Sequence, residues 1–262
     1  MQEIIITTVV IGVIGLIIGI ALVAAGKKFY VAVDEKAIAV RECLPGNNCG
    51  ACGYAGCDAV AAAIAAGVAP VNACPVCSAD AVAKIGGVMG LEAEAAQRKT
   101  AQVKCSGDCE HTSAKCNYVG IEDCRAAALA GLNTGSCTFG CLGYGSCVKV
   151  CTYDAIHVVN GVAKVDTSKC VGCGMCAKAC PKGLIEVVRA DRTFVVQCSN
   201  KDRGPAVKKV CSAGCLGCGA CVKQCEHDAI HVEGNLAYID YDKCVGCGKC
   251  AEKCPAKNIV RQ

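Results

Sequence analysis

The sequence predicts small α+β modules that fold around clustered cysteines, preceded by one apolar helix. Three observations carry this prediction: 28 cysteines among 262 residues, two cysteine runs of the same spacing, and a long internal repeat. The chain has no Trp and only 4% aromatic residues. So few large apolar side chains cannot fill one conventional core of this length. Bound metal is therefore expected to stabilise the fold, and the metal-free chain is expected to be largely unfolded.

Two twelve-residue runs hold cysteines at the spacing by which bacterial ferredoxins bind [4Fe–4S] clusters. CVGCGMCAKACP starts at Cys170 and CVGCGKCAEKCP at Cys244, and the two match at nine of twelve positions. Both read C-x2-C-x2-C-x3-C-P, in which the fourth cysteine ligates the other cluster of a pair. Structural zinc sites instead separate C-x2-C pairs by a dozen or more residues and often include His. The runs predict electron-transfer chemistry.

The second half of the chain repeats itself. Nine cysteines from Cys124 to Cys180 recur 74 positions later, and residues 147–158 match residues 221–232 at nine of twelve positions. Each copy also has an Asn-Gly or Gly-Asn pair between two short alternating segments, which is the signature of a two-residue hairpin turn. The repeat therefore predicts two ferredoxin-like modules, residues 124–197 and 198–262, each with two short helices and small β-hairpins around two clusters.

One position breaks the repeat, because Tyr144 stands where the second copy has Cys218. Cys137 is the nearest spare thiol and is expected to replace the missing ligand, while Cys198 and Cys211 stay unassigned. The crossed use of the fourth cysteine then predicts four ligand sets. These sets are Cys137, Cys141, Cys147 and Cys180; Cys151, Cys170, Cys173 and Cys176; Cys215, Cys218, Cys221 and Cys254; and Cys225, Cys244, Cys247 and Cys250.

The N-terminus predicts a membrane anchor over residues 1–26. Ile4 to Ala25 is a stretch of 22 residues without a charge. A helix of that length is about 33 Å long, enough to cross a bilayer. A cleavable signal peptide needs a basic segment before the apolar run, whereas Glu3 stands there. Lys27 and Lys28 follow the run, so the body of the protein is expected in the cytoplasm.

A charged connector over residues 27–42 leads to a predicted 4Fe–4S domain, residues 43–90. Three of its cysteines are spaced C-x2-C-x4-C, and a fourth follows after sixteen residues. Glycines between them allow the backbone to fold tightly around a cluster. Asp58 is expected to cap an alanine-rich helix that ends at Gly67. Cys43 and Cys77 are left over and are expected to be small buried residues.

Residues 91–123 are interpreted as a linker and a cysteine-rich insertion. Four cysteines follow one another as C-x3-C-x6-C-x7-C, which is not a standard ferredoxin spacing. They suit one further cluster, or partial ligation shared with Cys137, and bring the expected total to about five to six [4Fe–4S] clusters per chain. The four are Cys105, Cys109, Cys116 and Cys124.

The net charge does not indicate nucleic-acid binding. The formal value of +4 counts each cysteine as neutral. An oxidised [4Fe–4S] core with four thiolates carries about −2, so six clusters would bring the loaded chain to about −8. Lysines near the clusters are expected to compensate this charge or to form a docking face. The chain shows no nucleophile–base pair, no Walker loop and no dinucleotide fingerprint.

The order of these parts resembles the B subunit of the Rnf complex, in its clostridial type with expanded iron–sulfur modules. The most specific stretch is LPGNNCGACGYAGC directly after the predicted anchor. The resemblance implies a subunit of an ion-translocating ferredoxin:NAD⁺ oxidoreductase in the plasma membrane. Its expected partners are soluble ferredoxin and the other membrane and peripheral subunits, between which it relays electrons without a substrate site of its own. The resemblance also implies that the first cluster is ligated by Cys49, Cys52, Cys57 and Cys74.

Two other functions are compatible with parts of the sequence. A polyferredoxin that serves another dehydrogenase or hydrogenase would need the same cysteine runs, but the uncharged N-terminal stretch speaks against a soluble form. A structural zinc protein that binds nucleic acid would need paired cysteines at wide spacing, and the chain has only 4 His. Absorption near 400 nm would separate an iron–sulfur protein from a zinc protein.

Overall fold

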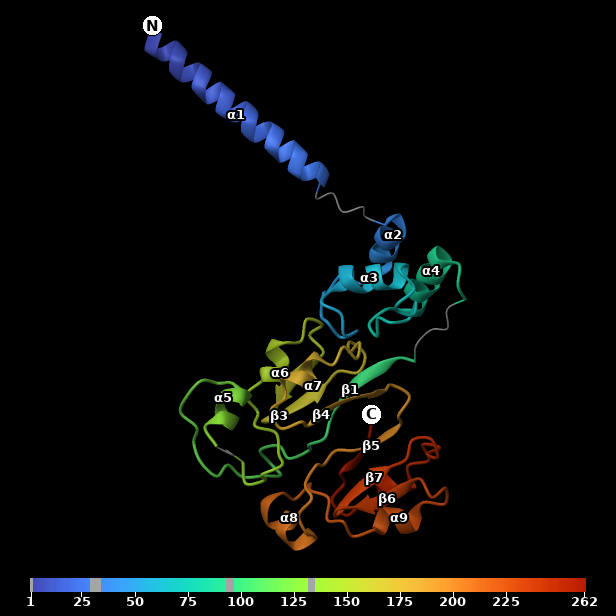
Figure 1. The fold of residues 1–262 in the computed structure, drawn as a ribbon. Helices are drawn as coiled ribbons and strands as arrows, with labels where there is room; N and C mark the ends of the chain where they lie inside the picture. The colour runs from blue at the N-terminus through green and yellow to red at the C-terminus, as the bar shows by residue number, and fades with distance from the viewer. Residues whose placement is uncertain (1, 29–33, 93–96, 132–134) are drawn as a thin grey trace.

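The structure is a computed structural model that describes residues 2–28, 34–92, 97–131 and 135–262. Residues 29–33 of the predicted connector, 93–96 of the predicted linker and 132–134 of the first predicted module lie outside the described residues. Helix α1 (Gln2–Lys28) extends away from the rest of the chain (Figure 1). Its described side chains are those of Ile6, residues 12–26 and Lys28. Within the described residues, no helix is long and apolar enough to cross a membrane.

Three helices form the domain that follows: α2 (Glu35–Cys43), α3 (Cys57–Ala65) and α4 (Ala79–Met89). They pack on a small core in which Val40, Val60 and Ile85 are fully buried. Ser78 begins α4 as its N-cap, because its Oγ accepts a hydrogen bond from the N–H of Ala81. Gly90 ends that helix in the left-handed conformation. This core contains only aliphatic residues of modest size and cysteines.

The start of α3 differs from the sequence prediction. The helix begins at Cys57 with Gly56 as its N-cap, so Asp58 lies inside the first turn and is not the cap. The free N–H of Cys57 instead donates to Oδ1 of Asn48 at 2.7 Å. Asp58 forms an ion pair with Arg41 of α2, at 2.7 Å between Nε and Oδ1. An asparagine nine residues earlier in the chain supplies the cap, which no local pattern could reveal.

Part of the predicted linker is a strand of the first module. β1 (Lys99–Val103) pairs antiparallel with β4 (Ile185–Arg189), with Ala101 opposite Val187. The sequence KTAQV alternates polar and apolar residues after Lys99, yet Thr100 and Gln102 are buried along with Ala101 and Val103. The side-chain N–H of Gln102 donates to the carbonyl of Val196 in the second module. Burial does not alternate along the strand because its polar face is also covered.

The described residues of the first ferredoxin-like module form the predicted hairpin and three short helices, one more than the two predicted. Its elements are α5 (Cys124–Leu129), α6 (Ser146–Lys149), β2 (Ile156–Val159), β3 (Val162–Val165), α7 (Met175–Ala179) and β4. β2 and β3 are antiparallel and joined by Asn160 and Gly161 alone. Both residues have positive φ, 50° and 80°, as a tight hairpin turn of this kind requires. The predicted turn is confirmed.

The second module repeats this arrangement (Figure 1). The module begins before the predicted boundary at residue 198, because β5 (Phe194–Val196) pairs with its last strand. Its other elements are α8 (Gly204–Val210), α9 (Ala220–Gln224), β6 (Ile230–Glu233), β7 (Leu236–Ile239), α10 (Lys249–Glu252) and β8 (Ile259–Arg261). Gly234 and Asn235 join β6 to β7, again with positive φ at both positions. β5 pairs with β8, as β1 pairs with β4 in the first module.

A glycine in each module brings a cysteine loop against the hairpin turn. Gly143 and its repeat counterpart Gly217 have φ of 78° and 62°. A Cβ on either would lie 2.7 Å from a turn carbonyl oxygen, that of Gly161 or of Asn235. These positions therefore exclude any larger residue, both by backbone conformation and by contact.

Replacing Gly217 by alanine is expected to weaken the second module. The left-handed backbone alone costs about 1–3 kcal/mol for a residue with a Cβ, and the carbonyl contact adds to it. The half-life of the 400 nm absorption of the cluster-loaded chain in guanidinium should shorten. Gly87→Ala is the matched control, since a Cβ there meets nothing within 4 Å. Equal half-lives for the two variants would contradict the prediction.

Candidate metal centres

All 28 cysteines lie in the described ranges, and each carries a free thiol. They gather in sets where loops meet the short helices, rather than in pairs that could be bridged. No three His, Cys, Asp or Glu side chains of the described residues converge on one metal ion. A cubane makes no such demand, because each of its four irons takes a separate thiolate. The sets therefore suit a cluster and not a single ion.

One predicted set lines a single cavity in the second module. The cavity has a volume of about 320 Å³, and its walls include Val232, Ala237 and Ile259 as well as four cysteines. The N–H of Ala237 in β7 donates to Sγ of Cys215 at 3.4 Å. An apolar cavity with four thiols and an amide directed at sulfur suits a [4Fe–4S] cluster. Its cysteines are Cys215, Cys218, Cys221 and Cys254.

The two inner sets follow the repeat in their hydrogen bonds as well as in their spacing. The N–H of Ala155 donates to Sγ of Cys151 at 3.5 Å, and the N–H of Ala229 donates to Sγ of Cys225 at 3.4 Å. In the first module, β1 adds a donor, from the N–H of Ala101 to Sγ of Cys170 at 3.3 Å. Amides directed at sulfur stabilise a thiolate and tune the potential of a bound cluster.

Burial disfavours the thiolate form in these sets. It raises the pKa of Cys176 to about 12 and the pKa of Cys221 to about 11. Without metal these thiols are protonated at neutral pH, because a charge is costly where water is excluded. A bound iron deprotonates a coordinating thiol outright. The buried thiols therefore fit a group that supplies its own positive charge.

The first domain holds its cysteines around the helix start at Cys57. Cys57 and Cys74 are buried in the core of the domain, and Cys52 packs against them. A hydrogen bond from Cys77 lowers the pKa of Cys74 to about 6. The same bond, together with burial, raises the pKa of Cys77, so Cys77 stays a protonated donor. Sequence reasoning left Cys77 without a role, because a donor to a ligand has no spacing rule of its own.

The site interrupted by Tyr144 contains a thiol that the repeat did not indicate. Burial, together with the neighbouring thiols of Cys141, Cys124 and Cys180, raises the pKa of Cys147 to about 11. Cys124 starts α5, and its N–H donates to Oγ of Ser146 at 2.7 Å, directly beside Cys147. The structure therefore brings Cys124 to this set, whereas the sequence predicted Cys137.

The four cysteines of the predicted insertion do not lie together. Cys105 accepts a hydrogen bond from the N–H of Cys141 at 3.5 Å, while Cys124 is at the set just described. Cys109 packs against the hairpin turn, where a Cβ on Gly161 would lie 2.9 Å from its Sγ. Cys116 is exposed. Of the two sequence interpretations, the arrangement favours ligation shared with other segments over a separate cluster within residues 105–124.

Comparison with known families supports iron–sulfur binding in three parts of the chain. A model described as "Putative Fe-S cluster" matches residues 44–76. A 4Fe-4S binding domain matches residues 163–186, and a 4Fe-4S dicluster domain matches residues 214–258. Together with the 28 cysteines, these matches show that the chain binds several [4Fe–4S] clusters.

Comparison with individual proteins identifies the family. The B subunit of the Na⁺-translocating ferredoxin:NAD⁺ oxidoreductase complex of Acetobacterium woodii is 46% identical over 235 residues, which cover 89% of this chain and 71% of that protein. This chain belongs to the B subunits of the Rnf complex. The B subunit of the proton-translocating ferredoxin:NAD⁺ oxidoreductase complex of Clostridium ljungdahlii is 40% identical, covering 92% of this chain and 85% of the relative. The B subunit of the ion-translocating oxidoreductase complex of Methanosarcina acetivorans is 38% identical, covering 94% of both chains.

Membership of the B-subunit family confirms the resemblance predicted from the cysteine pattern. It also confirms the prediction of an iron–sulfur electron-transfer subunit over that of a structural zinc protein. The names of the relatives differ in the translocated ion, sodium for one and protons for another. Relatives that are similar to this chain over most of their length are therefore named for different ions.

Replacing Cys124 by serine is expected to remove one cluster, about four irons per chain. The reason is that Cys124 takes the place of the ligand missing at Tyr144. Iron and acid-labile sulfide are counted on the anaerobically prepared holo-protein. Cys116→Ser is the matched control and should keep the full iron content, since Cys116 is exposed. Full iron in Cys124→Ser would contradict the arrangement.

Proposed function

We propose that this chain relays electrons between soluble ferredoxin and the membrane subunits of an ion-translocating ferredoxin:NAD⁺ oxidoreductase. Its iron–sulfur body would lie in the cytoplasm, tied to the plasma membrane by one N-terminal helix. The assignment to this complex is supported by relatives, similar over most of their length, whose names state the reaction. The clusters supply one-electron redox chemistry, and the chain's own residues bind them, donate hydrogen bonds to sulfur and exclude water.

One observation carries the proposal: ligands of successive sets are neighbours. Besides burial, the nearby thiols of Cys49 and Cys151 raise the pKa of Cys173, so the first domain and the first module meet through cysteines. Asn47 donates a hydrogen bond to the hydroxyl of Tyr153 across the same contact. Besides burial, Cys147 of the outer set likewise raises the pKa of Cys176 in the inner set. Electron tunnelling slows steeply with distance, so adjacency of this kind is what a relay needs.

The second module is the proposed docking end for ferredoxin. Among the ligands predicted from the ferredoxin runs, only Cys218 and Cys247 are exposed, and both belong to this module. Exposed Lys243 and Lys253 flank Cys247 in the sequence. A ligand at the surface shortens the path to a partner that binds and leaves. At the other end, the first domain directly follows α1 and would face the membrane subunits.

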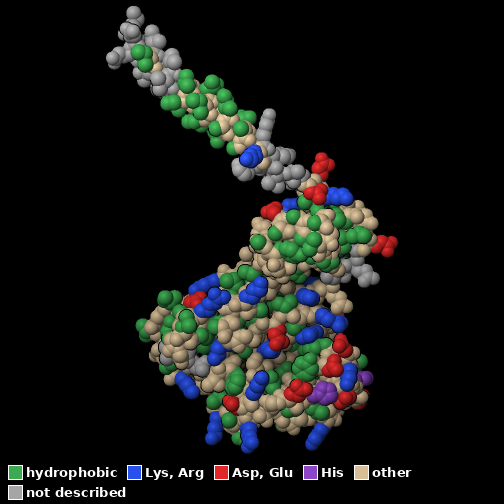
Figure 2. Space-filling model, in the orientation of Figure 1, with side chains coloured by type: hydrophobic (Ala, Val, Ile, Leu, Met, Phe, Trp, Pro, Cys, Tyr) green, Lys and Arg blue, Asp and Glu red, His purple; other side chains and the backbone are tan. Residues whose placement is uncertain are grey.

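The N-terminal helix is the proposed anchor. Leu16, Ile20 and Leu22 of α1 are each more than 60% exposed. Figure 2 shows the apolar side chains of this helix uncovered by any other part of the chain on the face in view. A row of large apolar side chains in water is unfavourable, so a lipid bilayer or a partner helix is expected to cover it. Gly15 and Gly19 form a G-x3-G face that suits close packing with a helix of another subunit.

Deleting residues 1–26 is expected to give a soluble chain with unchanged iron content. No cysteine precedes Cys43, so no ligand is removed. Both forms are expressed without the other subunits; the full chain should sediment with membranes and the shortened chain should not. Iron loss in the shortened chain would show that the helix belongs to the cluster fold. A full chain that stays in solution would favour the alternative, a polyferredoxin that serves another enzyme.

Replacing Cys57 by serine is expected to interrupt the relay near the membrane. The assembled complex should lose at least about tenfold of its ferredoxin:NAD⁺ activity, or about 1.4 kcal/mol of barrier. Reduced ferredoxin should still bleach the clusters of the two modules, whose ligands lie beyond Cys105. Cys43→Ser is the control with a cysteine of the same domain. Undiminished activity in a Cys57 variant that lacks one cluster would overturn the proposed order.

A further inference from the structure

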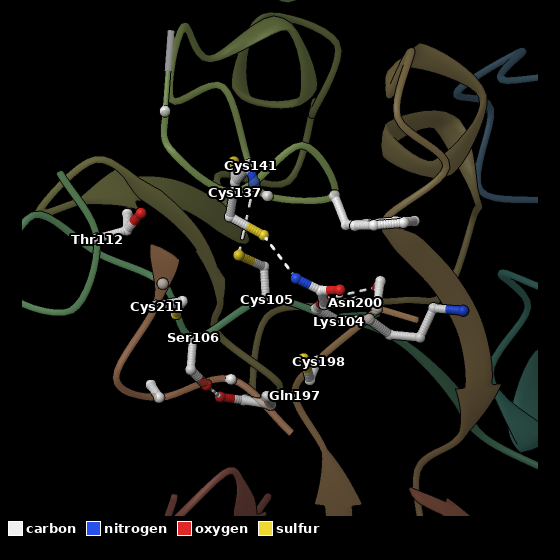
Figure 3. Close-up of a pocket in the computed structure, with 17 residues that line it drawn as sticks. Lys104, Cys105, Ser106, Thr112, Cys137, Cys141, Gln197, Cys198, Asn200 and Cys211 are labelled. Atoms are coloured by element: carbon white, nitrogen blue, oxygen red, sulfur yellow. Dashed lines mark hydrogen bonds between the residues drawn. The ribbon is translucent and has the colours of Figure 1, made fainter. Parts of the chain in front are cut away.

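Four cysteines outside the completed sets line one cavity between the two modules. The cavity has a volume of about 450 Å³ and is bounded by the segments 104–107, 135–141, 197–200 and 211–214 (Figure 3). Two of the four cysteines were unassigned by sequence, one was expected at the Tyr144 site, and one in the insertion. They are Cys105, Cys137, Cys198 and Cys211.

The sulfur atoms of Cys105 and Cys211 lie on the same side of Gly107. A Cβ built on Gly107 would be 3.7 Å from Sγ of Cys105 and 3.3 Å from Sγ of Cys211. The two cysteines are 106 positions apart in the chain, so only the fold brings them together. Gly107 leaves the space that a larger side chain would fill, and both thiols border that space.

Three of the four sulfurs accept hydrogen bonds from N–H groups. The N–H of Cys141 donates to Cys105 at 3.5 Å, and the N–H of Cys215 donates to Cys198 at 3.3 Å. The side-chain amide of Asn200 donates to Cys137 at 3.5 Å (Figure 3). Asn200 is only 2% exposed. A buried amide directed at sulfur is a donor of the kind that stabilises the thiolate ligands of a cluster.

Hydrogen bonds between the segments hold the cavity in shape. The hydroxyl of Ser199 donates to the carbonyl of Lys104 at 2.8 Å, and the hydroxyl of Thr112 donates to the carbonyl of Val210 at 2.8 Å. Ser106 donates to Oε1 of Gln197, also at 2.8 Å. Each bond joins the insertion to the segments around the second module. The four cysteines are therefore positioned by contacts that do not involve the thiols themselves.

We propose that Cys105, Cys137, Cys198 and Cys211 bind a further [4Fe–4S] cluster that connects the two ferredoxin-like modules. The donor set fits this group: four thiols, and N–H groups directed at three of the four sulfurs. With Cys124 in the Tyr144 set, each of six clusters has four cysteines. The remaining four cysteines are Cys43, Cys77, Cys109 and Cys116.

The position of this site explains how electrons pass between the modules, and this role rests on the proposed relay. Cys105 contacts the backbone of Cys141, a ligand in the outer set of the first module. Cys198 contacts the backbone of Cys215, a ligand in the outer set of the second. A cluster held between these two contacts would lie between the outer set of the first module and the outer set of the second. It would shorten the distance that an electron has to cross between them. The ligation itself is tested without any assay of electron transfer.

Single and double alanine variants test the site. Cys137→Ala and Cys211→Ala should each lose about four irons and four sulfides per chain. The double variant should also lose about four, because both residues hold the same cluster. Cys124→Ala combined with Cys137→Ala should lose about eight, because those residues hold different clusters. The counts are made on anaerobically prepared full chain, with electron paramagnetic resonance of the reduced protein to follow the remaining centres.

The sequence repeat alone predicts a different result. It gives Cys137 to the Tyr144 site and no ligand role to Cys211, so Cys211→Ala would keep all its iron. That result would overturn the proposal, as would additive loss of about eight irons in the Cys137 and Cys211 double variant. Zinc bound at this site, with the iron of the other clusters unchanged, would also overturn the proposal. It would show that the four cysteines hold a single metal ion and not a cluster.

A variant that keeps all four cysteines provides the second measurement. Asn200→Leu removes the amide that donates to Cys137 and keeps a branched side chain with the same number of heavy atoms. One centre should shift to a lower reduction potential at full iron content, because the reduced cluster carries more negative charge and loses a donor. Asn117→Leu, the same substitution at an exposed asparagine that does not line the cavity, should leave every potential unchanged. The absence of any shifted centre in Asn200→Leu would contradict the site even if the alanine variants failed to fold.

Discussion

The fold depends on thiolate ligation of iron in places where an ordinary domain would bury large apolar side chains. Its largest fully buried residues are valines and isoleucines, and much of the rest of each core is cysteine. Burial raises the pKa of most of the shifted thiols and a bound iron lowers it, so the clusters and the polypeptide stabilise each other. The tight loops, short helices and hairpins serve the same requirement, because they bring N–H groups to sulfur and keep water away. Bound clusters occupy the interior in place of large side chains. The absence of tryptophan and the shortness of the helices and strands follow from this.

The same requirement explains why the insertion between the first domain and the modules is ordered. β1 pairs with β4 and donates to Cys170 through Ala101, so a strand outside the repeat completes the surroundings of a cluster inside it. The next residues cross to the second module, where Gln102 and Ser106 bond to β5 and to Gln197. Residues 99–106 are thereby held by contacts with both modules. The two modules are joined by backbone and side-chain polar contacts, with a cavity lined by cysteines at the centre of the junction.

Duplication and divergence are visible at the cysteines themselves. Cys124 and Cys198 are repeat counterparts, yet one lies beside Cys147 and the other faces the cavity between the modules. Cys137 and Cys211 are also counterparts, and both face that cavity. Tyr144 packs against Tyr118 of the insertion, with ring centroids 5.2 Å apart, in the place where a ligand stands in the second copy. The proposed site takes cysteines from both copies of the repeat. A comparison of one copy with the other therefore could not reveal it.

The sequence by itself determined the chemistry and the family, and it predicted the local groups of cysteines. C-x2-C-x2-C runs place three sulfurs on one short loop, and the hairpin turns at Asn160-Gly161 and Gly234-Asn235 need only two residues with positive φ. Such features are encoded within a dozen residues, so spacing is enough to read them. Only the tertiary structure decided the cap of α3, the strand at residues 99–103, the neighbour of Tyr144 and the meeting of Cys105 with Cys211. These depend on residues that are far apart in the chain, and a contact between distant segments leaves no periodic trace in either one.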